Sequence, residues 1–151
     1  MNLLAPALVA LSVAAGACIA VQSSVNGLLA RGVGSPIAAA LISFGAGIVV
    51  LAALFVALVG PAGVVAGWRS LPAWVFLVGG PLGAAYITVA AFAVPRLGVT
   101  TYLTLVIAGQ LLAGLVLDHV GAFGLAQQAV SPGRILAACL VVSGAVLARV
   151  A

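Results

Sequence analysis

The sequence has very little charge. Only 4% of its 151 residues are charged: there are five arginines, no lysine and a single carboxylate, Asp118, whereas 66% of the residues are hydrophobic. A soluble domain has about 25% charged residues, so this composition excludes a soluble globular domain. The mean hydropathy of +1.46 predicts an integral membrane protein. Apolar runs of about 20 residues favour membrane-spanning helices, because the strands of a membrane barrel have about 10 residues.

Other absences exclude whole classes of function. Cys18 and Cys139 lie separately inside apolar runs, which predicts small buried thiols and no disulfide or metal site. The sequence contains no motif of a hydrolase, a nucleotide-binding protein or a metalloprotease, so we expect no enzymatic activity and no cofactor. The arginines occur singly, and no basic patch exists to bind a nucleic acid.

The apolar runs predict an all-α membrane protein in which residues 1–151 form a single domain of five spans. We expect the first span to end before Arg31, and the third to be closed by Pro95. Ser35 and Ser131 each precede a proline, an arrangement typical of a helix start. The predicted spans are residues 3–29, 36–59, 72–94, 97–117 and 132–148.

The arginines predict an unusual membrane topology. With five spans, Arg69 and Arg134 lie on the side of the N-terminus, and Arg31, Arg96 and Arg149 lie on the other. Because loop arginines orient a membrane protein, a split of two against three predicts insertion in both orientations. Five spans are also half of the inverted repeat found in many transporters. We therefore expect an antiparallel homodimer, or a pair with a homologous chain of opposite orientation.

Several amides are predicted inside the membrane. At 3.6 residues per turn, Gln22, Ser23 and Asn26 share one face of the first helix, and Gln110 lies near the middle of the fourth. An amide exposed to lipid is costly. These residues therefore either form hydrogen bonds between helices or contact a substrate, and the sequence leaves both interpretations open.

The third span contains a proline between small residues. Gly79, Gly80, Pro81 and Gly83 predict a kink or a break with close helix packing. Because several transporters build a binding site at a broken helix, Tyr86 is the residue of this segment that we expect to contact a substrate. A packing groove with a kink is the alternative.

Asp118 and His119 are adjacent at the end of the fourth span. This pair is the best candidate for proton coupling, because histidine titrates near neutral pH. Their position at the membrane surface favours a different role, in which Asp118 pairs with an arginine or caps the following turn. The dipole at a helix C-terminus disfavours a carboxylate, so we expect a compensating partner.

Together, these motifs resemble the YdcZ family, also called DUF606, of the drug/metabolite transporter superfamily. The residues that carry the resemblance are Asn26–Arg31 (NGLLAR) with Gly34, Ser35 and Pro36; Ser43 and Phe44; Gly79–Tyr86 (GGPLGAAY); Pro95–Gly98 (PRLG); Ala108–Leu111 (AGQL); and Asp118, His119, Gly121, Phe123 and Gly124. The resemblance covers essentially the whole chain. It implies five-helix units that occur as dual-topology chains, as paired genes or as fused ten-helix proteins.

The superfamily's small multidrug exporters use a glutamate on the first helix, where this chain has Gln22, Ser23 and Asn26. Their cation and proton mechanism therefore does not carry over. We expect a multi-pass protein of the bacterial inner membrane that transports a small neutral, zwitterionic or anionic metabolite by alternating access. The predicted substrate-binding residues are Gln22, Ser23, Asn26, Tyr86 and Gln110. A dual-topology ion channel and a membrane scaffold that transports nothing are the alternatives.

Overall fold

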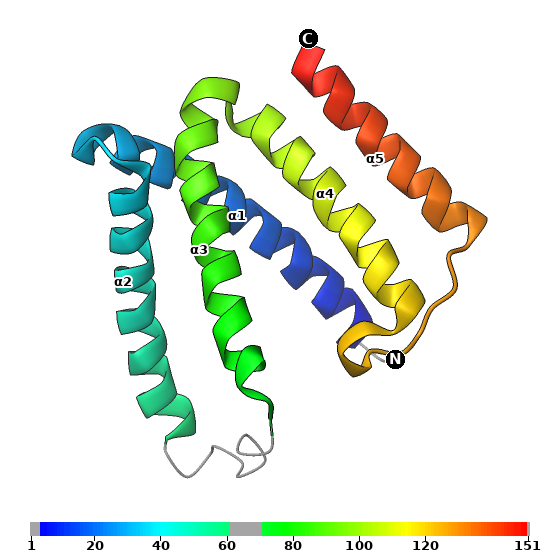
Figure 1. Cartoon of the computed structure of the whole chain (residues 1–151), viewed down its shortest axis with the longest axis horizontal. Coiled ribbons are helices and arrows are strands. Elements are labelled where there is room, and N and C mark those ends of the chain that lie inside the picture. The colour runs from blue at the N-terminus through cyan, green and yellow to red at the C-terminus, as the bar shows by residue number, and fades with distance from the viewer. Residues whose placement is uncertain (1–3, 61–70, 151) are drawn as a thin grey trace. The chain divides into compact units, whose positions relative to one another are not determined.

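The computed structural model describes residues 4–60 and 71–150, and Arg69 lies outside this part. The described residues form five long helices, which are labelled in Figure 1. They are α1 (Leu4–Val33), α2 (Pro36–Leu54), α3 (Ala73–Leu97), α4 (Val99–Val120) and α5 (Pro132–Val150), together with the π-helical segment η1 (Phe55–Val59), which extends α2, and the 3-10 helix η4 (Ala122–Gly124). All five long helices have the length and apolarity needed to cross a membrane, so the prediction of an all-helical membrane protein is confirmed.

The starts of two helices are as predicted. The Ser35 hydroxyl accepts a hydrogen bond from the backbone N–H of Ala38 at 3.2 Å, and Pro36 begins α2. Ser131 does the same for the N–H of Arg134 at 3.3 Å, ahead of Pro132. In both cases a serine satisfies a backbone donor that the first helical turn leaves without a partner.

Four helices, α1, α3, α4 and α5, end later than the sequence predicted, and two of them continue through residues that were expected to end them. α1 continues past Arg31 to Val33, and α3 continues through Pro95 to Leu97. Each added turn satisfies backbone groups that have no other partner near lipid, and an arginine in the last turn is favourable to the helix dipole. Only Gly98 then separates α3 from α4, with a φ of 79° that favours glycine.

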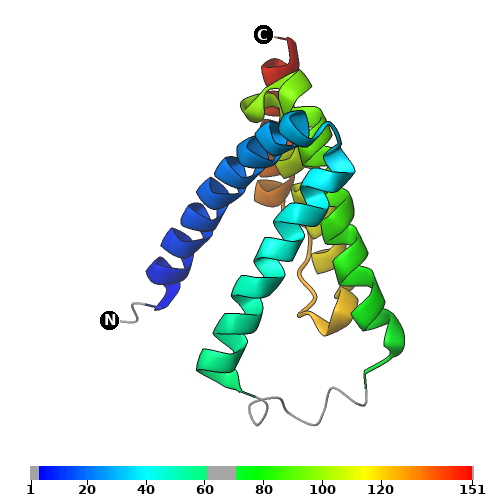
Figure 2. The ribbon, with the colours of Figure 1, turned by 90° about the vertical axis from the view of Figure 1, so that its left-hand side faces the viewer.

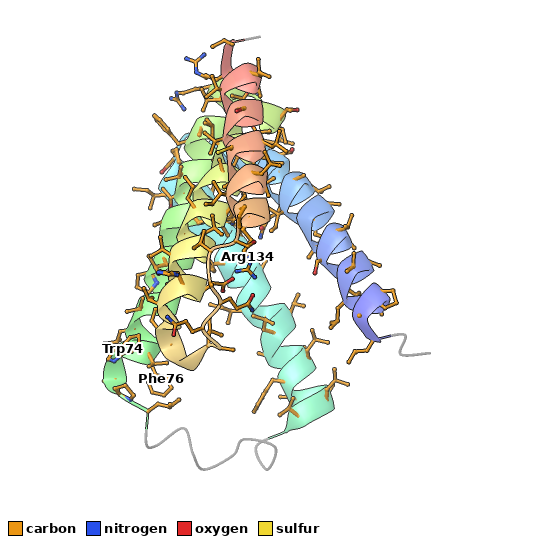
Figure 3. All side chains as sticks on the ribbon, turned by 90° about the vertical axis from the view of Figure 1, so that its right-hand side faces the viewer. Trp74, Phe76 and Arg134 are labelled. Atoms are coloured by element: carbon orange, nitrogen blue, oxygen red, sulfur yellow. The ribbon has the colours of Figure 1, made fainter. Side chains whose placement is uncertain are left out.

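The segment of α3 for which the sequence predicts a kink or a break is helical. The α-helix runs through Gly79, Gly80 and Pro81, and the distortion that the sequence predicts at these residues stays a prediction. A single proline removes one backbone hydrogen bond of the helix, and the remaining backbone hydrogen bonds hold the helix together. Trp74 and Phe76 lie at the beginning of α3 (Figure 3), where an aromatic ring can sit at the headgroup level.

The chain divides into two compact units, residues 1–95 and residues 96–151. In the first unit α1 and α2 meet at their connection and then diverge, as Figure 2 shows. Small residues form the core at the connected end, where Ala30, Ala39 and Ala91 are buried and Leu29 packs against them. Because the two helices diverge, the whole stretch from Leu4 to Ile19 is exposed in this chain.

In the second unit α4 and α5 lie side by side and antiparallel (Figure 1). A hydrogen bond joins them at each end. The Thr101 hydroxyl donates to the carbonyl oxygen of Ala148 at 3.0 Å, and a guanidinium nitrogen of Arg134 lies 3.1 Å from a carboxylate oxygen of Asp118. Thr101 and Asp118 are about 26 Å apart by helix rise, so the contact between the helices extends along most of α4.

Replacing Gly27 with leucine should destabilise the first unit. A Cβ atom at Gly27 would lie 3.2 Å from Pro95 Cγ and 3.5 Å from Val94 Cγ1, so a larger side chain forces α1 away from α3. We expect a loss of about 1–3 kcal/mol in the free energy of unfolding, as for other overpacked cores. Thermal unfolding in detergent, followed by circular dichroism, measures it.

Gly16→Leu is the matched control on the same helix, because nothing lies within 4 Å of a Cβ atom there. Equal losses at Gly16 and Gly27 would contradict the packing of α1 against α3.

Candidate functional site

Two polar side chains of α1 are fully buried in the first unit. Ser23 and Asn26 are each 1% exposed. The Ser43 hydroxyl of α2 donates a hydrogen bond to Asn26 Oδ1, and Asn26 Nδ2 has no hydrogen-bond partner among the described residues. A buried amide with half of its capacity unused costs stability, which makes Asn26 a candidate for a contact that is not purely structural.

The position of the connection explains why Asn26 meets Ser43. The turn between α1 and α2 lies at Gly34, whose φ is 72°, and the two residues stand at similar distances before and after it. Residues equidistant from a helix–helix turn come opposite one another. Ser43 was not among the site residues predicted from the sequence. Its distance from the turn, which matches that of Asn26, was the signal that could have found it.

Gln22 is separated from the buried pair. Its side chain is exposed, in a surface hollow of α1 that it shares with Ala17, Cys18, Val21 and Val25. The neighbouring Ser24 bonds to its own helix, through the Ala20 carbonyl oxygen at 2.9 Å, as expected for a serine that makes no contact outside its helix. Of the polar face predicted on α1, Ser23 and Asn26 are therefore buried within the chain, and Gln22 is exposed.

The candidates on α3 also differ from one another. Tyr86 is half-buried, and a Cβ atom at Gly83 would lie 3.2 Å from Cζ of Phe44 in α2, so the ring of Phe44 packs against this glycine. Nothing lies within 4 Å of a Cβ atom at Gly79 or Gly80. Of these three glycines of α3, only Gly83 therefore packs closely against another helix of this unit.

Gln110 is exposed on α4, about 17 Å by helix rise from the start of the helix at Val99. It lines a pocket of about 330 Å³ with Asp118 of the same helix and Arg134 of α5. The remaining lining residues are apolar: Leu111, Gly114, Leu115 and Ala137. The second unit thus brings together two predicted site residues, Gln110 and Asp118, and adds an arginine that had been assigned only to membrane topology.

Asp118 has the arginine partner that its position at a helix C-terminus required. The pair with Arg134 is formed by side chains that are 38% and 35% exposed, which fits the membrane surface. The second guanidinium nitrogen of Arg134 donates to Gln128 Oε1. Gln127 in turn donates to the carbonyl oxygen of His119 at 2.7 Å, so the connector between α4 and α5 is held against both helices.

The His119 side chain is exposed. None of the hydrogen bonds described around it involves its imidazole ring, and Asp118 pairs with Arg134 rather than with it. Proton coupling through Asp118 and His119 stays a prediction. Among residues 4–60 and 71–150, no group of three or more His, Cys, Asp or Glu side chains could hold a metal ion.

A model of one protein family matches residues 7–147 of the chain, which include most of α1 and α5 and all of α2, α3 and α4. The family is described as "Putative inner membrane exporter, YdcZ". No curated protein matches the chain, and neither does any solved structure.

The bond between Asn26 and Ser43 should couple α1 to α2 energetically. In a double-mutant cycle of Asn26→Ala and Ser43→Ala, we expect a coupling energy of about 0.6 kcal/mol and at most about 1.7 kcal/mol, the range of hydrogen bonds between membrane helices. Unfolding of the four proteins in detergent measures it. Ser24→Ala, combined with Asn26→Ala, is the control and should show additive effects, because Ser24 bonds within α1. Additivity in the Ser43 cycle would contradict the coupling.

Proposed function

The chain belongs to the YdcZ family of inner membrane exporters, and on this premise we propose that it moves a small metabolite by alternating access as an antiparallel dimer. The family match and the five helices able to span a bilayer make it a multi-pass protein of the bacterial inner membrane. The family is not one of enzymes. The dimer, the mechanism and the substrate are the parts we propose.

The exposure of two amides carries this proposal. Gln22 and Gln110 lie far from the ends of their helices, yet both side chains are exposed in the single chain. Amides in contact with lipid tails lose their hydrogen bonds to water without replacement. A second protein surface that encloses an aqueous cavity gives both amides hydrogen-bond partners. A second copy of this chain is always available to supply that surface.

The distribution of arginines supports the antiparallel arrangement. Arg31, Arg96 and Arg149 occupy the last turns of α1, α3 and α5, and Arg134 occupies the first turn of α5. With alternating spans, the first three lie on one side and Arg134 on the other. The bare N-terminal half of α1 offers small exposed residues, including Gly16 and Ala17, that permit close packing against another helix.

In this dimer we place Gln22, Asn26, Tyr86 and Gln110 around the central cavity, with Ser23 beside Asn26. The spans carry no free acid, since the one carboxylate, Asp118, lies in the last turn of α4 and is paired. A neutral, zwitterionic or anionic substrate therefore fits the cavity better than a cation.

Flux in proteoliposomes tests the transport function and the residues of its site. With vesicles preloaded with a bacterial metabolite extract, wild-type protein should catalyse saturable counter-transport of at least one compound, detected by mass spectrometry. Gln22→Ala and Tyr86→Ala should each lower its rate at least tenfold, because each removes a polar contact of the cavity, and Ser24→Ala should not. Wild-type rates in both variants would remove these residues from the site. Rapid flux without counter-transport would indicate a channel, and no flux at all would indicate a scaffold.

Membrane orientation tests the antiparallel dimer. Reporters that are active only on one side of the membrane, fused to the C-terminus, should both be active in the native chain, because the arginine bias is small. Val150→Arg should move the C-terminus toward the cytoplasm, and Leu125→Arg, in the connector between α4 and α5, should move it the opposite way. Both sites are exposed. A native chain with one fixed orientation would instead require an oppositely oriented partner chain.

A further inference from the structure

The pocket of the second unit has the composition of a binding site for a ligand with two opposite charges. One end carries the Asp118–Arg134 ion pair, with 3.1 Å between nitrogen and oxygen. Gln110 lies about 12 Å deeper along α4 by helix rise, and Leu111, Leu115 and Ala137 form the apolar walls. Its volume of about 330 Å³ is at the lower end for small-molecule pockets.

We propose that this pocket binds an amino-acid-like zwitterion, whose carboxylate contacts Arg134 and whose ammonium group contacts Asp118. The apolar walls then receive the side chain of the ligand, and Gln110 gives a hydrogen bond to a ligand long enough to reach it. The inference rests on the proposed transport function, because it names the class of substrate.

The charge balance of the pocket favours a zwitterion over a simple ion. An anion that binds Arg134 is repelled by Asp118 close by, and a cation that binds Asp118 is repelled by Arg134. A zwitterion inserted between the two side chains replaces one ion pair with two and leaves the net charge at zero. Charge-assisted hydrogen bonds of this kind are the stronger ones in proteins.

Both side chains keep unused hydrogen-bonding capacity. One oxygen of Asp118 pairs with Arg134, so the other can accept from an ammonium group. Arg134 uses one nitrogen for Asp118 and another for Gln128, although a guanidinium has five donors. Asp118 is also the sole acidic side chain of the sequence, so it is the one carboxylate side chain that this protein offers to an ammonium group.

A binding assay that is independent of transport tests this assignment. The purified full-length protein in detergent is titrated by calorimetry with each of the twenty standard amino acids, and then with the amide and the N-acetyl derivative of the tightest binder. The amide is a cation and the N-acetyl derivative an anion, so the three probes differ in charge. We expect the amino acid to bind at least tenfold more tightly than either derivative.

Variants separate recognition from structural support. Asp118→Asn and Arg134→Gln should each weaken binding at least tenfold, whereas Val120→Ala, an exposed position of α4 outside the pocket, should not. Each single substitution should also lower the melting temperature, because it breaks the ion pair. The charge exchange Asp118→Arg with Arg134→Asp restores an ion pair and leaves the arginine on the same face of the membrane, so it should bring the melting temperature back. The wild-type protein should prefer the L enantiomer of its ligand over the D enantiomer, and because the charge exchange swaps two of the three contacts to the ligand, this preference should be lost or reversed.

The proposal is overturned if no amino acid binds, if the charged derivatives bind as tightly, if Asp118→Asn and Arg134→Gln bind normally, or if the charge exchange keeps both affinity and enantiomer preference. These failures are distinct from a failure of the transport function. Counter-transport of another compound at wild-type rates in Asp118→Asn would leave the carrier standing without this substrate class. Amino-acid binding without flux in proteoliposomes would leave the site standing without the carrier.

Discussion

The absence of hydrogen-bond partners in a lipid bilayer is the constraint on which this structure depends. It makes every span a helix, and it governs the polar side chains as well. The hydroxyls of Ser12, Ser24 and Thr88 each donate to the carbonyl oxygen four residues earlier. Two hydroxyls make bonds outside their own helix, from Ser43 to Asn26 and from Thr101 to the carbonyl oxygen of Ala148, and each of these bonds joins two helices. At these two points a helix contact coincides with a polar group that must be satisfied.

The sequence was sufficient to predict the helices, because length and apolarity decide whether a segment spans a bilayer. It was less reliable at their ends. Arg31 and Pro95 are normal markers of a helix end in soluble proteins, yet α1 and α3 continue through them, since near a membrane an extra turn is favoured over unpaired backbone groups. The same preference keeps α3 continuous at Pro81.

The residue types of the candidate site could be predicted from the sequence, but which of its residues are buried and which are exposed could not. Asn26 lies between Ser23 and Gln22 on the helical wheel, at about 60° from one and 40° from the other. Within this chain Ser23 is buried and Gln22 is exposed. Gln22 lies about one turn further than Asn26 from the connection between α1 and α2, and the two helices diverge away from that connection (Figure 2). Which neighbour covers a face depends on the angle between helices, which periodicity does not contain.

A carrier must also be stable between substrates. Two opposite charges left apart at a membrane surface would be costly in the empty state, whereas Asp118 and Arg134 form a pair at 3.1 Å when nothing lies between them. A zwitterion that separates them supplies two new ion pairs, and when it leaves the original pair can re-form. The empty and occupied pockets thus have the same net charge, and neither contains an unpaired ion. For a chain with one acidic side chain, the exchange of ion partners that we propose gives specificity for charge without a fixed charge that would hold the proposed carrier in one state.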